Sequence, residues 1–397
     1  MRRTGHIRER SPGSFELRYG LGTDPATGKR KMATTTVRGS RKDAEKELRR
    51  LLRSLDTGEH VDPTRITVQE WLGTWLDAVR VEVSPKSHER YGEIVSHYLA
   101  PALGKLQLAK LAAVHITGVY NALATGGRCD GKEGGLSPRT RRHIHRILSA
   151  ALSRAVEQQL LARNPADAFK KRLPKVERRE MATLTAHQAQ ALLAAIRHAR
   201  VYWPVLIALA TGARRGEILA LRWRNVDLDR GSLCIVESLE QTKAGLRFKA
   251  PKSEKTRAIT LPAFAVAELR RLKREQAESL LMLGVRQSGA TLVCARADGE
   301  PMPPRSLTHE FLKAIRRVED VPRVRFHDLR HSHATHLLVA GVHPKVAQER
   351  LGHSSISVTL DLYSHVTGTM QEEAAAKLDI AFQSAISGAT SGVGDPR

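Results

Sequence analysis

Five short polar segments lie in order along the second half of the chain and share one kind of chemistry. Together they offer arginine, lysine, histidine and tyrosine side chains, and they lack the carboxylate pair that a sugar or peptide hydrolase would show. Arginine and lysine bind phosphate, and a tyrosine hydroxyl can attack a phosphodiester. The pattern therefore predicts a site in which cations hold a phosphodiester while a tyrosine attacks it. The segments are TGARRGE (211–217), PKSEKTR (251–257), HDLRH (327–331), LGHSS (351–355) and LDLYSH (360–365).

The chain carries a large surplus of positive charge. Its 397 residues contain 65 Lys and Arg against 41 Asp and Glu, a formal net charge of +24. A surplus of that size favours a polyanionic partner, most simply nucleic acid. A generally basic proteome is the alternative explanation. The length allows two or three domains, and a hydrophobic content of 41% supports real cores.

Cysteine usage and hydropathy indicate the cellular compartment of the protein. The three cysteines lie far apart without CxxC or CxxH spacing, which argues against a disulfide framework or zinc finger and favours a reducing cytosol. No apolar run approaches the ~20 residues of a membrane span. The basic start, MRRTGHIRERSPGS, is not followed by the apolar segment of a signal peptide. We therefore expect a cytoplasmic, nucleoid-associated protein with no membrane partner.

The residue patterns predict a mainly α-helical fold of three domains and a tail. The first is a small β-sheet with one helix, the second is helical, and the third is mostly helical with a β-hairpin insert. Boundaries are expected at a linker near VDPTR and at the basic stretch KKRLPKVERRE. The predicted ranges are 1–62, 63–175, 176–386 and a disordered tail of Gly, Ser and Ala over 387–397.

The first domain combines strand and helix signals with basic charge. Apolar and polar residues alternate in FELRY (15–19), and KMATTTV (31–37) is rich in threonine, so both predict strands. Ser40 stands before a run with capping-box spacing that predicts a helix to about Leu55. The domain is interpreted either as a DNA-binding module or as a folded extension, and the charge favours DNA binding.

The second domain has helical spacing throughout. Trp71 and Trp75 fit the core rather than base stacking. Ser137-Pro138 and Asn164-Pro165 bound a predicted helix over 137–165. Its expected inner face is Ile144, Leu148, Leu152, Val156 and Leu160.

Two basic clusters in and after this domain are candidates for phosphate contact. A charge run on a helix is usually a solvated face, but a cluster of almost one sign favours DNA. The candidate DNA-binding residues are Arg139, Arg141, Arg142, Arg146, Lys170, Lys171 and Arg172.

The third domain interrupts its helices with strands. Thr185 begins a helix with a capping pattern. Between 232 and 261 the segments SLCIVES, LRFKA and TRAITL are strand-like and are joined by turns. Lys252 lies in the turn before the last of these strands, and Lys255 in the same turn is the alternative lysine.

The order, spacing and flanking residues of the five segments resemble the tyrosine recombinases, the phage integrase family. The resemblance covers nearly the whole chain and is most specific over 205–365. It implies that Arg214, not Arg215, is the first catalytic arginine, and that Glu217 orients it. It identifies the other catalytic residues as Lys252, His327, Arg330, His353 and the nucleophile Tyr363, with Asp328 and His365 as supporting residues.

The chemistry of phosphoryl transfer fits the same residues. The transition state carries roughly two negative charges, which two arginine forks can stabilise without a metal ion or other cofactor. His327 would accept the proton of the attacking hydroxyl, because a histidine titrates near neutral pH. Lys252 would protonate the leaving 5′ oxygen, and His353 would donate a hydrogen bond to a non-bridging oxygen. The product is a 3′-phosphotyrosyl link that stores bond energy, so rejoining needs no ATP.

Three alternatives stay open at this point. The first is a metal-dependent hydrolase, suggested by the histidine cluster His327, His331, His333 and His336, in which the first two have the spacing of a metal site. However, HDLRH lacks the glutamate of HExxH and sets Arg330 beside any metal. A type IB topoisomerase or a chromosome-dimer resolvase would use the same six residues. The extra module at the front favours an integrase over both. A DNA-binding protein that has lost catalysis is the third alternative.

The resemblance also implies partners. Residues 1–62 are similar to the arm-type DNA-binding domain of phage integrases, and 63–175 to their helical core-binding, SAM-like domain. A homotetramer on double-stranded DNA with core and arm attachment sites is expected, together with an excisionase and a DNA-bending host factor. The predicted helix over 370–386 would dock in cis or onto a neighbouring subunit.

Overall fold

A computed structural model of the chain describes residues 5–23, 28–56, 65–177, 181–251 and 256–363, together with 375, 376, 378–380, 382 and 383. For Thr23, Ser54, Asp56, Val358 and residues 361–363 it describes the backbone alone. The chain divides into two compact units, Met1–Glu177 and Arg178–Arg397, and each is described by itself. Helices dominate the described part of both, so the prediction of a mainly α-helical fold with small sheets is confirmed.

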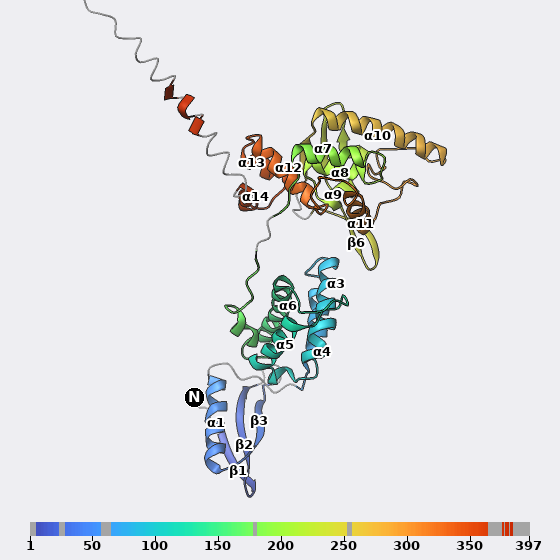
Figure 1. Cartoon of the computed structure of the whole chain (residues 1–397). Helices are drawn as coiled ribbons and strands as arrows, with labels where there is room; N and C mark the ends of the chain where they lie inside the picture. Colours follow the sequence, from blue (N-terminus) through green and yellow to red (C-terminus); the bar gives the residue numbers. More distant parts are fainter. Residues whose placement is uncertain are drawn as a thin grey trace, which may run out of the picture. The chain divides into compact units, whose positions relative to one another are not determined.

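The first unit begins with an antiparallel sheet in the order β1-β2-β3, with α1 packed against it (Figure 1). Phe15, Leu17 and Tyr19 of the middle strand are buried under the helix, as their alternation predicts. Ser40 caps α1, because its hydroxyl accepts from the Asp43 amide at 3.3 Å. The first strand was missed from sequence. The elements are β1 (Gly5–Ser11), β2 (Ser14–Thr23), β3 (Arg30–Arg38) and α1 (Arg41–Asp56).

A helical bundle follows, built around two tryptophans. Trp71 is 1% exposed, and its indole donates to the Ala151 carbonyl at 2.9 Å. Trp75 stacks on Tyr91 with ring centroids 5.7 Å apart. Both lie in the core, as predicted. The elements are α2 (Val68–Val79), α3 (Pro85–Ile94), η1 (Val95–Leu99), α4 (Ala100–Leu103), η2 (Leu108–Lys110), α5 (Ala113–Thr125), α6 (Pro138–Glu157) and η3 (Pro165–Phe169).

Helix α6 begins at the predicted proline but ends earlier than predicted. Its inner residues Ile144, Leu148 and Leu152 are fully buried. The helix stops at Glu157, because Gln159 turns into the left-handed region at φ 58°. The prediction that it continues to Asn164 was wrong, and Asn164 instead caps the short helix η3 with its side chain.

The second unit packs its helices around a large apolar core with two small sheets (Figure 1). The elements are α7 (Ala186–Ala195), α8 (Tyr202–Thr211), α9 (Arg215–Ala220), η4 (Trp223–Asn225), β4 (Val226–Asp227), β5 (Ser232–Ile235), β6 (Ser238–Thr242), β7 (Gly245–Lys249), β8 (Arg257–Thr260), α10 (Ala263–Met282), α11 (Pro304–Ile315), α12 (Asp328–Val339), α13 (Pro344–Leu351) and α14 (Ile356–Tyr363).

The strands predicted between 232 and 261 are present and divide between two sheets. Strands β4, β5 and β8 pair in that order, while β6 and β7 form a separate hairpin. Thr185 caps α7 by accepting from the Gln188 amide at 3.2 Å, as predicted. Strand β8 starts directly after the segment 252–255, which lies outside the described residues.

Helix α8 is buried and leads directly into the segment that carries Arg214. Most of its side chains are buried, including Val205, Leu206 and Ile207, and it packs against α12. The helix ends at Gly212, which has φ +66°. A Cβ at Gly212 would lie 2.5 Å from Leu351 and 2.7 Å from His333, so only glycine fits where α8, α12 and α13 meet.

Two predictions concern segments that are described in part or not at all. Of the predicted helix over 370–386, short helical stretches at 375–376, 378–380 and 382–383 are described. The predicted tail, 387–397, lies outside the described residues. Within the parts of the chain that the structure describes, no helix is long and apolar enough to cross a membrane.

The buried indole of Trp71 gives a direct test of the first unit's core. We expect Trp71→Ala to lower the free energy of unfolding by about 3–5 kcal/mol, since it opens a cavity and strips the Ala151 carbonyl of its donor. Urea unfolding measures this. Val81→Ala serves as control, because Val81 is 90% exposed and should change stability by under about 0.5 kcal/mol. Equal effects of the two substitutions would contradict this packing.

Candidate active site

Arg214 stands at the turn between α8 and α9. Its amide donates to Glu217 Oε2 at 2.9 Å, and its Nη1 donates to Glu217 Oε1 at 2.8 Å. Its Nη2 donates to the Gly352 carbonyl at 2.9 Å. The side chain remains 25% exposed, so the guanidinium is held from behind and still faces solvent.

Glu217 is a buried carboxylate shared by two arginines. It is 1% exposed, and besides Arg214 it accepts from Arg257 Nη2 at 2.6 Å and Nη1 at 3.2 Å. Burial raises the pKa of Glu217, but the hydrogen bonds from Arg257 and Arg214 outweigh it and hold the pKa below its ordinary value. Glu217 is therefore ionised at neutral pH and fixes both guanidiniums.

Arg330 is a buried cation with an open hydrogen-bonding position. It lies in the first turn of α12 and is 3% exposed. Its Nη1 donates to the Gly212 carbonyl at 2.8 Å, whereas Nη2 is buried without a hydrogen-bond partner among the described residues. Burial and the nearby Arg214 lower its pKa to about 9, so Arg330 stays charged at neutral pH. An unpaired buried guanidinium nitrogen is costly, and a bound anion would supply the missing acceptor.

Two histidines lie in the field of these arginines. His327 precedes α12, and its ring meets that of His331 edge to face with centroids 5.4 Å apart. His353 follows α13, and its Nδ1 lies 2.9 Å from Thr359 Oγ1. Desolvation, together with Arg330 and Arg214, lowers the pKa of each to about 4. Both rings are neutral near pH 7, and a bound anion would raise both pKa values.

The remaining predicted catalytic residues are described in part or not at all. Helix α14 ends at Tyr363, and the helix packs against α12, which carries Arg330, and α13, which precedes His353. The Tyr363 side chain is not described. Lys252 and His365 lie outside the described residues.

Asp328 supports the helix rather than facing the arginine cluster. This buried carboxylate accepts from the Arg325 amide at 2.8 Å and from the Arg325 guanidinium at 2.8 and 3.0 Å. It therefore secures the start of α12, where His327 and Arg330 lie. Arg215 points elsewhere, with a hydrogen bond to Thr308.

Three residues of the site were not assigned to it from sequence. Arg257 pairs with Glu217. Arg350 donates to the Ala210 carbonyl at 3.0 Å and to His333 Nε2 at 3.1 Å, and His333 Nδ1 lies 2.7 Å from the Leu209 carbonyl. The string PKSEKTR signalled a basic turn, but nothing in it separates Arg257 from its neighbours.

The candidate DNA-binding residues lie on the first unit's surface. Arg139, Arg142 and Arg146 are exposed along α6, while Arg141 is partly buried. The other three follow η3 and are exposed: Lys170, which pairs with Asp167 at 3.0 Å, Lys171 and Arg172.

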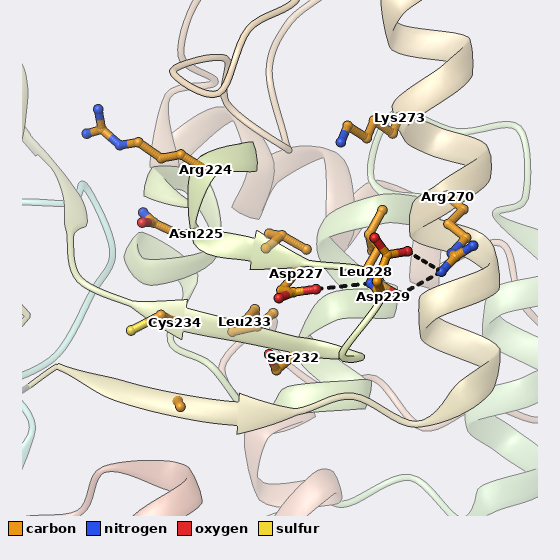
Figure 2. A pocket seen from close by; sticks show the side chains of 12 residues that line it. Arg224, Asn225, Asp227, Leu228, Asp229, Ser232, Leu233, Cys234, Arg270 and Lys273 are labelled. Atoms are coloured by element: carbon orange, nitrogen blue, oxygen red, sulfur yellow. Dashed lines mark hydrogen bonds and ion pairs between the residues drawn. The ribbon is translucent and has the colours of Figure 1, made fainter.

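A separate hollow lies beside β4, β5 and α10 of the second unit (Figure 2). None of the predicted catalytic residues lines it. Arg270 at its rim donates to Asp229 and to the Leu228 carbonyl, both at 2.9 Å. In the described ranges, no group of three or more His, Cys, Asp or Glu side chains is arranged to hold a metal ion.

The arrangement can bind and polarise a phosphodiester. Three arginines against one carboxylate leave two positive charges around Arg330 Nη2. Neutral histidines beside them can exchange protons or donate hydrogen bonds. Such preorganised donors stabilise developing negative charge most where water is excluded.

Comparison with known proteins gives two family matches. Residues 182–370 match the phage integrase family, and residues 67–124 match the N-terminal SAM-like domain of phage integrases.

Individual proteins show the same relationship. The chain is 26% identical to the ICEBs1 integrase of Bacillus subtilis (strain 168) across 94% of this chain and 99% of that protein. It is 32% identical to a tyrosine recombinase XerC of Mycobacterium sp. (strain KMS) across 54% of this chain and 67% of that protein. A lambda integrase, solved as a tetramer bound to a Holliday junction, shares the fold with a TM-score of 0.57 and 20% identity, across 90% of this chain and 94% of that one.

The buried His333 predicts a pH dependence of stability. Burial lowers its pKa to about 4, whereas an unfolded histidine titrates near 6.5. Its contribution to stability is thus complete above about pH 6.5 and is lost as the pH falls towards 4, at up to about 1.4 kcal/mol per pH unit. Between about pH 6.5 and 4.5, we expect the free energy of unfolding of His333→Asn to fall less steeply with falling pH than that of wild type. The difference in slope should be up to that value, and urea unfolding measures it.

A surface histidine provides the control for this measurement. His309 is exposed on α11, so His309→Asn should keep the wild-type slope. A His333→Asn variant with the wild-type pH dependence would show that His333 does not stay neutral in the native state.

Proposed function

The chain belongs to the phage integrase family of tyrosine recombinases, which cleave and rejoin DNA strands, and on that premise we propose that it integrates and excises a phage or other mobile element at a specific site. The substrate is double-stranded DNA. Each strand is cut by a tyrosine and rejoined through a 3′-phosphotyrosyl intermediate.

The observation that supports this proposal is Arg330 Nη2, which has no hydrogen-bond partner among the described residues. This nitrogen is buried, and Arg330 interacts electrostatically with Arg214, His327 and His353. The scissile phosphate would accept from Arg330 Nη2 and from the solvent-facing side of Arg214. Because both cations are held before substrate arrives, their reorganisation adds little to the barrier.

Tyr363 is the proposed nucleophile. As its oxygen attacks phosphorus, the phenolic proton would pass to neutral His327, whose pKa rises once the phosphate anion lies beside it. His353 would donate to a non-bridging oxygen, with Thr359 holding its other ring nitrogen. Lys252 would give its proton to the departing 5′ oxygen. Bond energy is retained in the phosphotyrosyl link, so neither ATP nor a metal ion enters the reaction.

The DNA would be held by basic surfaces of the first unit, in addition to the arginines of the site in the second unit. Arg139, Arg142 and Arg146 present one charged side of α6 to solvent, which suits the attachment core. The lambda integrase neighbour is a tetramer on a Holliday junction, and we propose the same assembly here. An excisionase and a DNA-bending host factor, together with action at the nucleoid in the cytoplasm, belong to the same proposal.

The first sheet is proposed to bind the arm sites. The face opposite α1 carries the exposed residues Arg8 and Arg18, with Thr34 paired to Arg18 on the neighbouring strand. Glu16 lies on the same face opposite Arg8 and forms an ion pair with Arg10, so basic residues predominate. A β-sheet face of this kind can enter a major groove. We therefore propose three domains, over 1–62, 63–175 and 176–386.

The topoisomerase and chromosome-dimer resolvase alternatives are not favoured. Neither calls for the basic sheet module at the front, and the similarity to the ICEBs1 integrase extends over 94% of this chain.

The nucleophile is tested by trapping. A nicked suicide duplex from the DNA flanking the gene, incubated with the protein in EDTA, should give an SDS-resistant adduct. Tyr363→Phe should abolish the adduct and leave DNA affinity within about threefold, because only the attacking oxygen is removed. Tyr98→Phe, a tyrosine of the first unit, should form it normally. Residual adduct in Tyr363→Phe would refute the assignment, and its absence in wild type at a proven site would refute the function.

The arm-site role is tested on the exposed sheet face. Arg8→Ala with Arg18→Ala should weaken binding to arm DNA and reduce the salt slope of log K by roughly 0.9 for each phosphate that the protein no longer neutralises. Arg41→Ala with Arg49→Ala, on α1, is the matched control. Cleavage of isolated core DNA should be unchanged in both. Equal loss of arm binding in the two double variants would contradict the proposed face.

A further inference from the structure

Arg257 stands directly behind the Arg214–Glu217 pair. Its Nη1 and Nη2 donate to the Glu217 carboxylate at 3.2 and 2.6 Å, and its Nε donates to the Arg350 carbonyl at 3.0 Å. All three guanidinium nitrogens are thus engaged with protein acceptors. Its side chain is 9% exposed against 25% for Arg214, so Arg214 is the more open of the two to solvent.

The hydrogen bond to the Arg350 carbonyl connects Arg257 to the carboxyl end of α13. Arg350 lies in the last turn of α13, and the next residue but one, Gly352, accepts from Arg214 Nη2 at 2.9 Å. Gly352 adopts φ +65°, and a Cβ there would lie 3.1 Å from the Arg257 side chain. His353 follows immediately. Arg257 therefore binds one support of Arg214, Glu217, directly, and it binds the end of α13 two residues before the other, Gly352.

Arg257 is also the first residue of β8. The proposed acid Lys252 lies five residues before it in the sequence. The residue that pairs with Glu217 therefore lies close in sequence to the proposed acid.

Charge balance gives Arg257 a second effect. With Arg257 present, two guanidiniums share one Glu217 carboxylate, so a net positive charge remains for the phosphate. Without Arg257, the Glu217 carboxylate would pair with Arg214 alone. It would cancel the charge of Arg214 and pull its guanidinium towards Glu217. A buried carboxylate with one partner fewer would also cost stability.

We propose that Arg257 is a positioning residue that acts on catalysis through Arg214, by sharing Glu217 and by holding the α13 carboxyl end. The proposal rests on the function proposed above. It assigns Arg257 no contact with DNA, so its loss should slow cleavage at unchanged affinity for core DNA.

The experiment is single-turnover cleavage of a suicide duplex with a 5′-bridging phosphorothiolate, whose better leaving group keeps slow variants measurable. Arg257→Met should cleave about 10- to 100-fold more slowly than wild type, the scale expected for a small misplacement of a catalytic group. Its affinity for DNA should stay within about threefold. Arg222→Met is the matched control and should cleave normally, because Arg222 is a partly buried arginine that pairs with Glu237 at 3.2 Å away from the site.

A double-mutant cycle separates positioning from a general structural role. In an Arg214→Gln background, Arg257→Met should slow cleavage by less than about threefold, because the residue that it positions is already gone. A loss in that background as large as in wild type would overturn the proposal. So would an Arg257→Met rate equal to that of Arg222→Met.

Arg257→Lys covers the case in which Arg257→Met does not fold. Lysine keeps the charge but cannot span Glu217 and the Arg350 carbonyl, so we expect an intermediate rate and the same loss of effect in Arg214→Gln. A lysine variant with the wild-type rate, or one whose loss persists in that background, would overturn the proposal. If wild type itself forms no adduct, the proposed function fails; if wild type cleaves and the arginine variants do not differ, only the role of Arg257 fails.

Discussion

The shared carboxylate of Glu217 is the interaction on which the rest of the site depends. It is 1% exposed and accepts from Arg214 and Arg257 at 2.6 to 3.2 Å. A carboxylate in such a place is unfavourable alone and becomes favourable only when its lone pairs are filled by cations. The hydrogen bonds from Arg214 and Arg257 to Glu217 join α9 to β8. The bond from Arg257 to the Arg350 carbonyl then joins both to α13. Arg214, the proposed catalytic arginine, is thereby held by three elements distant in sequence.

The second constraint is the buried Arg330 cation, whose hydrogen bonds are not all formed among the described residues. Arg330 is buried with one nitrogen unpaired among the described residues, and its neighbours Arg214 and Arg257 repel it while Glu217 attracts it. The fold bears this cost because Asp328 secures the start of α12 and Gly212 supplies a carbonyl. Binding of a phosphodiester would relieve it. The same unpaired cation therefore makes the free site less stable and would favour binding of the phosphate.

Much of the fold could be predicted from local signals. Ser40 and Thr185 begin their helices as capping rules require, and the alternation at Phe15, Leu17 and Tyr19 marked a buried strand. Local rules were wrong at the end of α6, where Gln159 adopts φ 58° although its residue type gives no stop signal. They also missed β1, whose polar residues acquire a strand conformation only by pairing with β2.

The sequence by itself determined the chemistry of this protein: the residue types, their order and their spacing predicted a tyrosine that attacks a phosphodiester held by arginines. Those signals are local and can be read along the chain. Only the tertiary structure decided how the arginines are held, because the Arg257–Glu217 pair joins positions 40 residues apart and the Arg214–Gly352 contact joins positions 138 apart. A partnership between buried charges depends on how the elements pack, and no local pattern encodes which arginine will share which carboxylate.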